Sequence, residues 1–197
     1  MCENEDNEKK ESGFRQSNDT LKKTRTIIIC GEITQKLAEK TAAELLFLQS
    51  ESETEPVKII LNSQGGHVES GDTIHDMIKF IKPKVIMIGT GWVASAGITI
   101  YLGADKKRRY SLPNTRYLIH QPSGGMRGQT SDIEIETNEI LKMRKRLNRL
   151  ISDATGQAYE RIEKDSNRNF WLSAEEAKEY GIVDSIITNL EEINKTV

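Results

Sequence analysis

The sequence predicts an α/β fold, because short apolar runs alternate with stretches of helical periodicity. The runs at 26–30 (TIIIC), 57–62 (VKIILN) and 84–88 (KVIMI) are typical of buried strands. Residues 34–50 and 69–81, which lie between these runs, carry apolar side chains at helical spacing. This strand–helix–strand order indicates parallel strands joined by helical crossovers.

Turn residues and caps delimit the elements that follow. A helix is expected to begin in the small-residue segment 94–97, and strands are expected near 107–111 and 116–120. After a glycine-rich loop, a long amphipathic helix is expected over about 131–155, with Gly156 as its C-cap.

A capping box marks the last helix, since Ser173 is followed three residues later by Glu176. That helix is expected to end at Gly181, just before the strand-like run 183–187 (VDSII).

The chain divides into a polar arm and one domain. Residues 1–24 are charged and nearly free of apolar side chains, so they are expected to be mobile in isolation. Residues 25–197 are expected to form a single domain, because a chain of 197 residues with 36% hydrophobic content can build one sizeable core.

Charge and cysteine content favour a cytoplasmic protein without a nucleic-acid or membrane partner. The formal net charge is −2, and the basic run 106–109 is expected to be a solvated face. Cys2 and Cys30 form no CxxC pair, which fits a reducing compartment, and Cys30 is expected to be a buried small hydrophobe. The acidic start is unlike a signal peptide, and no apolar stretch approaches the roughly 18 residues that span a bilayer.

Three loops that follow strands contain the residue types of acyl-transfer chemistry. Gly66 belongs to a glycine pair that lets the backbone approach a ligand, Ser95 lies at an open helix start, and His120 leaves an apolar strand. A serine nucleophile needs a base within hydrogen-bond reach, which His120 can supply. A tetrahedral oxyanion needs two donors, and the N–H groups of Gly66 and Ala96 can supply them.

Each of these residues also has an ordinary structural explanation when it is taken alone. Ser95 fits a helix N-cap, and His120 fits a histidine at a strand end. His67 and His75 are assigned structural roles, in a loop and on a surface helix. The sequence lacks HExxH spacing and the full GxGxxG or GxxxxGK patterns, so no metal, nucleotide or other cofactor is expected. Spacing alone therefore indicates no more than a hydrolase.

Five stretches in register resemble ClpP, the proteolytic subunit of the Clp protease. They are LNSQGGHVESG, GWVASAG, LPNTRYLIHQP, GGMRGQTSDIEI and AEEAKEYGIVDSII, and the likeness covers about residues 25–188. The resemblance implies a ClpP/crotonase-like fold, a spiral of strand–strand–helix units in a head domain, with a projecting handle at about 125–155. It also places Gly124–Gln129 on the strand that borders the substrate cleft and pairs across the ring–ring interface.

The resemblance further implies a function. Family members form seven-membered rings that stack into a tetradecamer and cut unfolded polypeptides, which an AAA+ unfoldase, the Clp ATPase, delivers. By position, Ser95 matches the nucleophile and His120 the base, while Gly66 and Ala96 match the oxyanion hole.

The sequence departs from the family at the third catalytic position, where Asn169 replaces the usual aspartate. Asp165 lies about one helical turn earlier and is not that position. An asparagine accepts a hydrogen bond from the histidine but brings no charge to stabilise the imidazolium, so reduced peptidase activity is expected. A divergent paralogue that works in mixed rings beside a fully equipped ClpP is one explanation.

Of three alternatives, the first two require residues that this sequence does not show at the site, and the third is the serious one. A crotonase-type acyl-CoA enzyme shares the fold but needs a carboxylate near the loop that holds Ser95. A signal-peptide peptidase relative pairs its serine with a lysine. The third alternative is a weakly active or inactive ring subunit that assembles with and regulates an active paralogue.

Overall fold

The computed structural model describes residues 19–124 and 127–195, and a mixed sheet lies at its centre. The strands are β1 (Thr26–Ile33), β2 (Val57–Gly66), β3 (Val85–Ala94), β4 (Arg109–Ser111), β5 (Arg116–Ile119), β6 (Phe170–Leu172) and β7 (Ser185–Ile186). Their order is β1-β2-β3-β4-β7, with β5 paired to β3 and β6 paired to β5. The β5–β6 pair is antiparallel, whereas the other pairs are parallel, as the strand–helix alternation predicts.

Helices connect and cover these strands. They are α2 (Gln35–Glu51), α3 (Val68–Phe80), α4 (Ala96–Tyr101), α5 (Thr130–Thr155), α6 (Tyr159–Asp165) and α7 (Ala174–Tyr180), with 3₁₀ turns at Lys106–Arg108 and Leu190–Lys195. The predicted capping box opens α7, and Gly156 ends α5 with a φ of 81°. The sequence patterns predict neither α6 nor β6.

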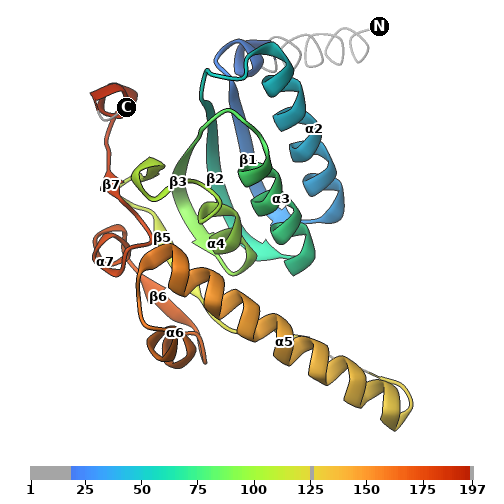
Figure 1. Cartoon of the computed structure of the whole chain (residues 1–197). Helices are drawn as coiled ribbons and strands as arrows, with labels where there is room; N and C mark the ends of the chain where they lie inside the picture. The colour runs from blue at the N-terminus through green and yellow to red at the C-terminus, as the bar shows by residue number, and fades with distance from the viewer. Residues whose placement is uncertain (1–18, 125–126, 196–197) are drawn as a thin grey trace, which may run out of the picture.

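The core lies between the sheet and the helices α2 and α3, which run side by side over one face of β1–β3 (Figure 1). Alternation along the strands explains which side chains point inward. Ile27, Ile29 and Ile33 of β1 are buried, as are Ile59 and Leu61 of β2. Packing of α2 and α3 on the sheet therefore fixes the positions at which β2 and β3 end.

Strand β3 changes partners halfway along its length. Residues 87–89 pair with β4, and residues 92–94 pair with β5. Ser95 follows β3 directly, and His120 follows β5 directly. Because the carboxyl ends of parallel neighbours meet at one edge, this switch brings the two residues together.

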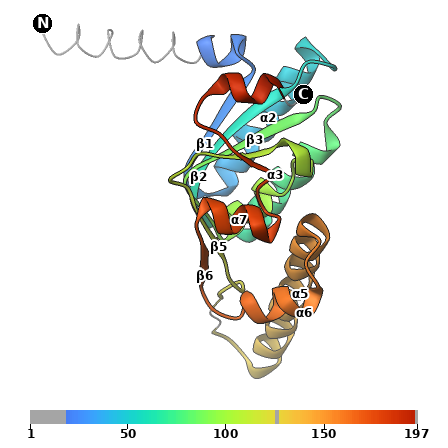
Figure 2. The ribbon, with the colours of Figure 1, turned by 90° about the vertical axis from the view of Figure 1, so that its left-hand side faces the viewer.

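Helix α5 projects from the head as a long arm, seen from two directions in Figures 1 and 2. Its buried residues all lie in its last two turns: Asn148, Ile151, Ser152 and Thr155. An ion pair between Arg146 and Asp72 joins α5 to α3 through two hydrogen bonds of 2.9 and 2.5 Å. The remainder of the arm is largely exposed, including Ile133 and Ile135.

Parts of the predicted arm and handle lie outside the described residues, namely 1–18 and 125–126. Residues 19–23 are helical. In the segment Gly124–Gln129, the described residues 124 and 127–129 pair with no strand of the same chain.

Two side chains differ from their predicted burial. Cys30 is exposed rather than buried, because it alternates with the buried Ile29 and points away from the core side of β1. His75 is buried rather than on a surface, and its Nδ1 lies 2.8 Å from the carbonyl oxygen of Thr99. Since a carbonyl only accepts, Nδ1–H is the donor in this bond.

Arg109 is buried, although its basic run 106–109 is predicted to be solvated. Its guanidinium is buried and donates to the carbonyl oxygens of Ala154, at 2.8 Å, and Ile182, at 3.3 Å. Ala154 lies in the last turn of α5, where carbonyls lack helical partners and the helix dipole favours a cation. Arg109 therefore anchors the base of α5 to the sheet.

None of the helices in the described part of the chain combines the length and apolarity required to cross a bilayer.

Acidification is expected to destabilise the fold through His75. Burial lowers the pKa of His75 below its usual value near 6.5, and Lys79 adds to this, although the Thr99 bond and Asp76 and Asp72 oppose it. The unfolded chain therefore takes up a proton before the folded one, so stability is lost as pH falls below about 6.5. One such proton gives a slope of at most about 1.4 kcal/mol per pH unit.

Urea unfolding of His75→Asn between pH 7.5 and 5, at fixed protein concentration, checks this expectation. An asparagine amide retains a donor near Nδ1 but does not titrate, so the slope attributable to this site is expected to disappear. His67→Asn, at an exposed histidine in the preceding loop, is the matched control and is expected to retain the slope. An unchanged slope in His75→Asn would contradict the assignment.

Candidate functional site

Ser95 occupies a sharp turn between β3 and α4. Its φ of 56° and ψ of −124° lie in a region that L-residues rarely adopt and that costs about 1–3 kcal/mol. The turn is held on both sides, because the Ser95 N–H donates to the Leu118 carbonyl at 3.0 Å and the Ser95 carbonyl accepts from Ile98 N–H at 2.9 Å. The hydroxyl is thereby directed toward the end of β5.

Three predicted residues form one hydrogen-bonded chain. The Nε2 atom of His120 lies 2.8 Å from Oγ of Ser95, and its Nδ1 lies 2.9 Å from Oδ1 of Asn169. An amide oxygen only accepts, so Nδ1 carries the proton and donates to Asn169. Nε2 is then free to accept the proton of the Ser95 hydroxyl.

The register of β5 against β6 explains why Asn169 faces His120. Ile119 pairs with Phe170 in this antiparallel ladder, so the next rung along joins residues 120 and 169. A slip of one residue would move Asn169 to the other face of the strand.

Gln121 ties the loop before β6 to the loop after β5. Its N–H donates to the Ser166 carbonyl at 2.6 Å, and its side-chain amide donates to the Asn167 carbonyl at 2.7 Å. Ser166 in turn donates to Oδ1 of the buried Asn148 in α5, at 3.0 Å. The sequence alone does not predict these contacts, because the hydrogen-bond partners of a glutamine depend on the tertiary structure.

The glycine pair approaches both Ser95 and β1. A Cβ on Gly65 would lie 2.6 Å from the Ser95 Cβ, and a Cβ on Gly66 would lie 2.3 Å from the Ile33 carbonyl oxygen. His67 N–H, rather than Gly66 N–H, donates to that carbonyl, so in a parallel ladder the Gly66 amide faces away from β1. Ala96 is the first residue of α4, where N–H groups have no partner within the helix.

Asp165 is engaged away from the site. Its Oδ2 accepts from the Tyr180 hydroxyl at 2.9 Å and lies 3.6 Å from Arg161. Burial raises the pKa of Tyr180, and the hydrogen bond to Asp165 raises it further. Among the described residues, no three His, Cys, Asp or Glu side chains are grouped to hold a metal ion.

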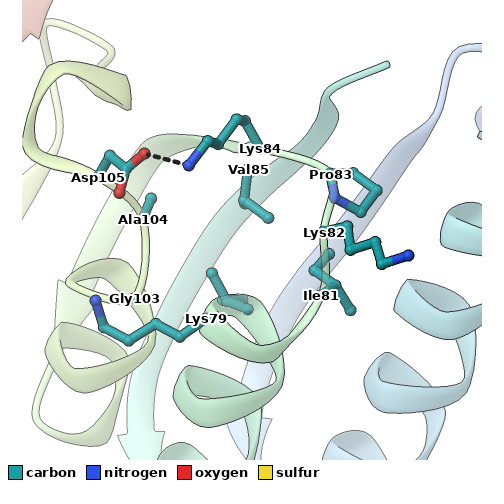
Figure 3. Close-up of a pocket in the computed structure, with 10 residues that line it drawn as sticks. Lys79, Ile81, Lys82, Pro83, Lys84, Val85, Gly103, Ala104 and Asp105 are labelled. Carbon is teal, nitrogen blue, oxygen red and sulfur yellow. Dashed lines mark ion pairs between the residues drawn. The ribbon is translucent and has the colours of Figure 1, made fainter. Parts of the chain in front are cut away.

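A cavity of about 320 Å³ lies at the opposite end of β3 (Figure 3). Lys79, Lys82 and Lys84 line it, and an ion pair of 3.6 Å joins Lys84 to Asp105 at its edge. Ten residues of extended strand, roughly 33 Å, separate Val85 at the cavity from Ser95. The cavity is therefore separate from the Ser95 site.

Solved structures with a similar fold include two of ClpP1 from Listeria monocytogenes. A mutant of ClpP1 from Listeria monocytogenes, with one asparagine replaced by aspartate, is 61% identical with a TM-score of 0.83. ClpP1 from the same organism is 60% identical with a TM-score of 0.81. Each comparison covers 89% of this chain and 98% of the other. The predicted ClpP-type α/β fold is therefore confirmed.

Sequence relatives agree with the structural comparison. A protein from Rhizobium johnstonii named ATP-dependent Clp protease proteolytic subunit 3 is 56% identical over 97% of this chain and 98% of its own length. One from Pseudomonas aeruginosa, named proteolytic subunit 2, is 53% identical over 87% and 85%. The family model described as Clp protease matches residues 8–190. The chain belongs to the Clp protease family, among its proteolytic subunits.

Replacement of Gly65 by alanine is expected to destabilise the fold and displace Ser95. The new Cβ would overlap the Ser95 Cβ, and the φ of +101° adds backbone strain of about 1–3 kcal/mol. Gly31→Ala is a matched control, because Gly31 has a similar φ of +88° but open space around it. Urea unfolding should show a larger loss for Gly65→Ala than for Gly31→Ala, and equal losses would contradict the close approach.

Proposed function

We propose that this subunit of the Clp protease family is a serine endopeptidase with Ser95 as nucleophile, His120 as general base and Asn169 as the residue that orients His120. The observation that carries the proposal is the continuous hydrogen-bonded chain, at 2.8 and 2.9 Å, from the Ser95 hydroxyl to the Asn169 amide. Its geometry is that of an activated nucleophile whose base is oriented by a third group.

In this mechanism, His120 moves one proton in each direction. Nε2 takes the proton of the Ser95 hydroxyl as Oγ attacks the substrate carbonyl, and it then gives that proton to the leaving amine. A water molecule then attacks the acyl group, with Nε2 again taking the proton and returning it to Oγ of Ser95, and the acyl group is released. Asn169 keeps the second proton on Nδ1 throughout, so Nε2 remains available.

The amides of Gly66 and Ala96 are proposed to hold the oxyanion. Support comes from the direction of the Gly66 amide, away from β1, and from the position of Ala96 at the start of α4. Gly66 ends β2 and Ala96 begins α4, so both donors belong to regular elements.

The neutral third residue is proposed to lower the intrinsic activity. Asn169 is exposed in the chain, and its amide offers one acceptor oxygen and no negative charge to the imidazolium. An Asp→Asn change in another serine protease costs about 10⁴ in kcat. This chain likewise has an asparagine, Asn169, where the family usually has an aspartate.

Substrate delivery is proposed to depend on a second protein in the cytoplasm. The relatives are named ATP-dependent, and this sequence contains neither the full GxGxxG nor the full GxxxxGK pattern, which fits an ATPase on a separate chain. An AAA+ unfoldase that feeds unfolded polypeptide fits this division of labour.

Exposed apolar side chains support assembly into rings. Ile28 is exposed on the outer face of the sheet, and Leu46 and Phe47 are exposed on α2, so two different surfaces carry apolar side chains. Contacts between unlike surfaces generate rings when the rotation closes. Seven-membered rings stacked through α5 into a tetradecamer are the proposed assembly, homomeric or mixed with a second ClpP paralogue.

A second candidate function is a weakly active or inactive ring subunit that regulates an active paralogue. The uncharged Asn169 favours it. The two functions differ in whether Ser95 reacts.

Asn169→Asp is expected to raise the turnover of a short fluorogenic peptide at least tenfold, because a carboxylate stabilises the imidazolium that forms during attack. Asn114→Asp adds the same charge in the exposed turn between β4 and β5 and is expected to change nothing. No gain in Asn169→Asp would argue against the role given to Asn169.

Labelling with a serine-reactive fluorophosphonate is expected to place the adduct on Ser95 and to fail in His120→Ala. Native mass measurement on the same fraction gives the assembly state. Absence of adduct in every assembly state, including mixed rings, would favour the regulatory subunit over the enzyme.

A further inference from the structure

Three side chains form a stack over β5, two residues from Asn169. The Trp92 and Trp171 rings are stacked, with centroids 6.5 Å apart and planes 9° apart. The Arg116 guanidinium lies 4.3 Å from the Trp171 ring centroid. The stack therefore links strands β3, β5 and β6.

Strand alternation puts this stack on the same face as the candidate site. Leu118 pairs with Trp171, and residues 120 and 169 form the rung two residues further along. Successive side chains point to opposite faces, so Trp171 and Asn169 share one face of β6. One period of the strand, about 6.6 Å, separates them.

Strand β6 pairs with one neighbour, and Gln121 fixes the loop that precedes it. The strand has three residues and pairs with β5 alone. Phe170 packs against Tyr180, at 5.7 Å between ring centroids, and Leu172 is buried on the inner side. On the outer side, Trp171 is the only residue of β6, so it alone supplies the side-chain contacts of that face.

We infer that Trp171, held by Arg116 and Trp92, is a positioning residue that fixes the register of β6 and thereby the hydrogen bond from His120 to Asn169. The inference rests on the proposed function. A carboxylate presents two equivalent oxygens to Nδ1–H, whereas an amide presents one. An asparagine at this position therefore tolerates less displacement than an aspartate, and the stack compensates by holding the strand.

The test compares the full-length Trp171→Leu and Trp171→Phe variants in two backgrounds, with Asn169 and with Asn169→Ala. Fluorophosphonate labelling of Ser95 supplies the maximal rate and the half-saturating concentration, and hydrogen exchange reports protection of the 170–172 amides. Tyr159→Leu is the matched control, because it removes a similar arginine–aromatic contact, with Arg149 at 4.7 Å, away from β6.

With Asn169 present, Trp171→Leu is expected to lower the maximal labelling rate about tenfold, leave the half-saturating concentration unchanged and speed exchange of the β6 amides. Trp171→Phe is expected to retain the rate within about threefold. In the Asn169→Ala background, Trp171→Leu should cost less than twofold, because residues acting through one contact are not additive. Tyr159→Leu should alter none of these values.

Equal losses in both backgrounds would overturn the positioning role, since a general structural defect does not depend on Asn169. Unchanged exchange of the β6 amides in Trp171→Leu would overturn it whatever the labelling shows. Absence of labelling at wild-type Ser95, with exchange still sensitive to Trp171→Leu, would instead overturn the proposed function and leave the register role in place.

Discussion

The division of β3 between two partner strands is the constraint on which the candidate site depends. Its first half pairs with β4 and its second half with β5, while β2 stays paired with it as far as Val93. Parallel pairing with β5 then places the end of that strand beside the turn at Ser95. The hydrogen bond from the Ser95 N–H to the Leu118 carbonyl joins the turn to β5 directly. Without the switch, Ser95 and His120 would end different edges of the fold.

A second, weaker constraint positions Asn169. Strand β6 is antiparallel to β5 and brings Asn169 opposite His120 from a segment 49 residues later in the chain. Gln121 fastens the preceding loop, and Ser166 connects that loop to Asn148 in α5. Hydrogen bonds therefore connect α5 to the loop that precedes Asn169.

Charge distribution at the site follows from the same geometry. Asp165, the last residue of α6, bonds to Tyr180 and Arg161 rather than to His120. The buried Arg109 binds the α5 base through carbonyl oxygens. The fold forms with an asparagine at residue 169, which bonds to His120 without a carboxylate.

Local sequence determined the parallel α/β alternation, the caps at Gly156 and Ser173, and the identity of Ser95 and His120 as reactive residue types, since each follows from spacing or from one residue's chemistry. Tertiary structure decided what no local pattern contains. The three-residue β6 is too short to show alternation, and its partner β5 lies about 50 residues earlier. The predicted exposure of Cys30, His75 and Arg109 is wrong, because their burial depends on which face of a strand or helix another element covers. The distances that join Ser95, His120 and Asn169 arise from strand register, which is fixed by packing across the whole sheet.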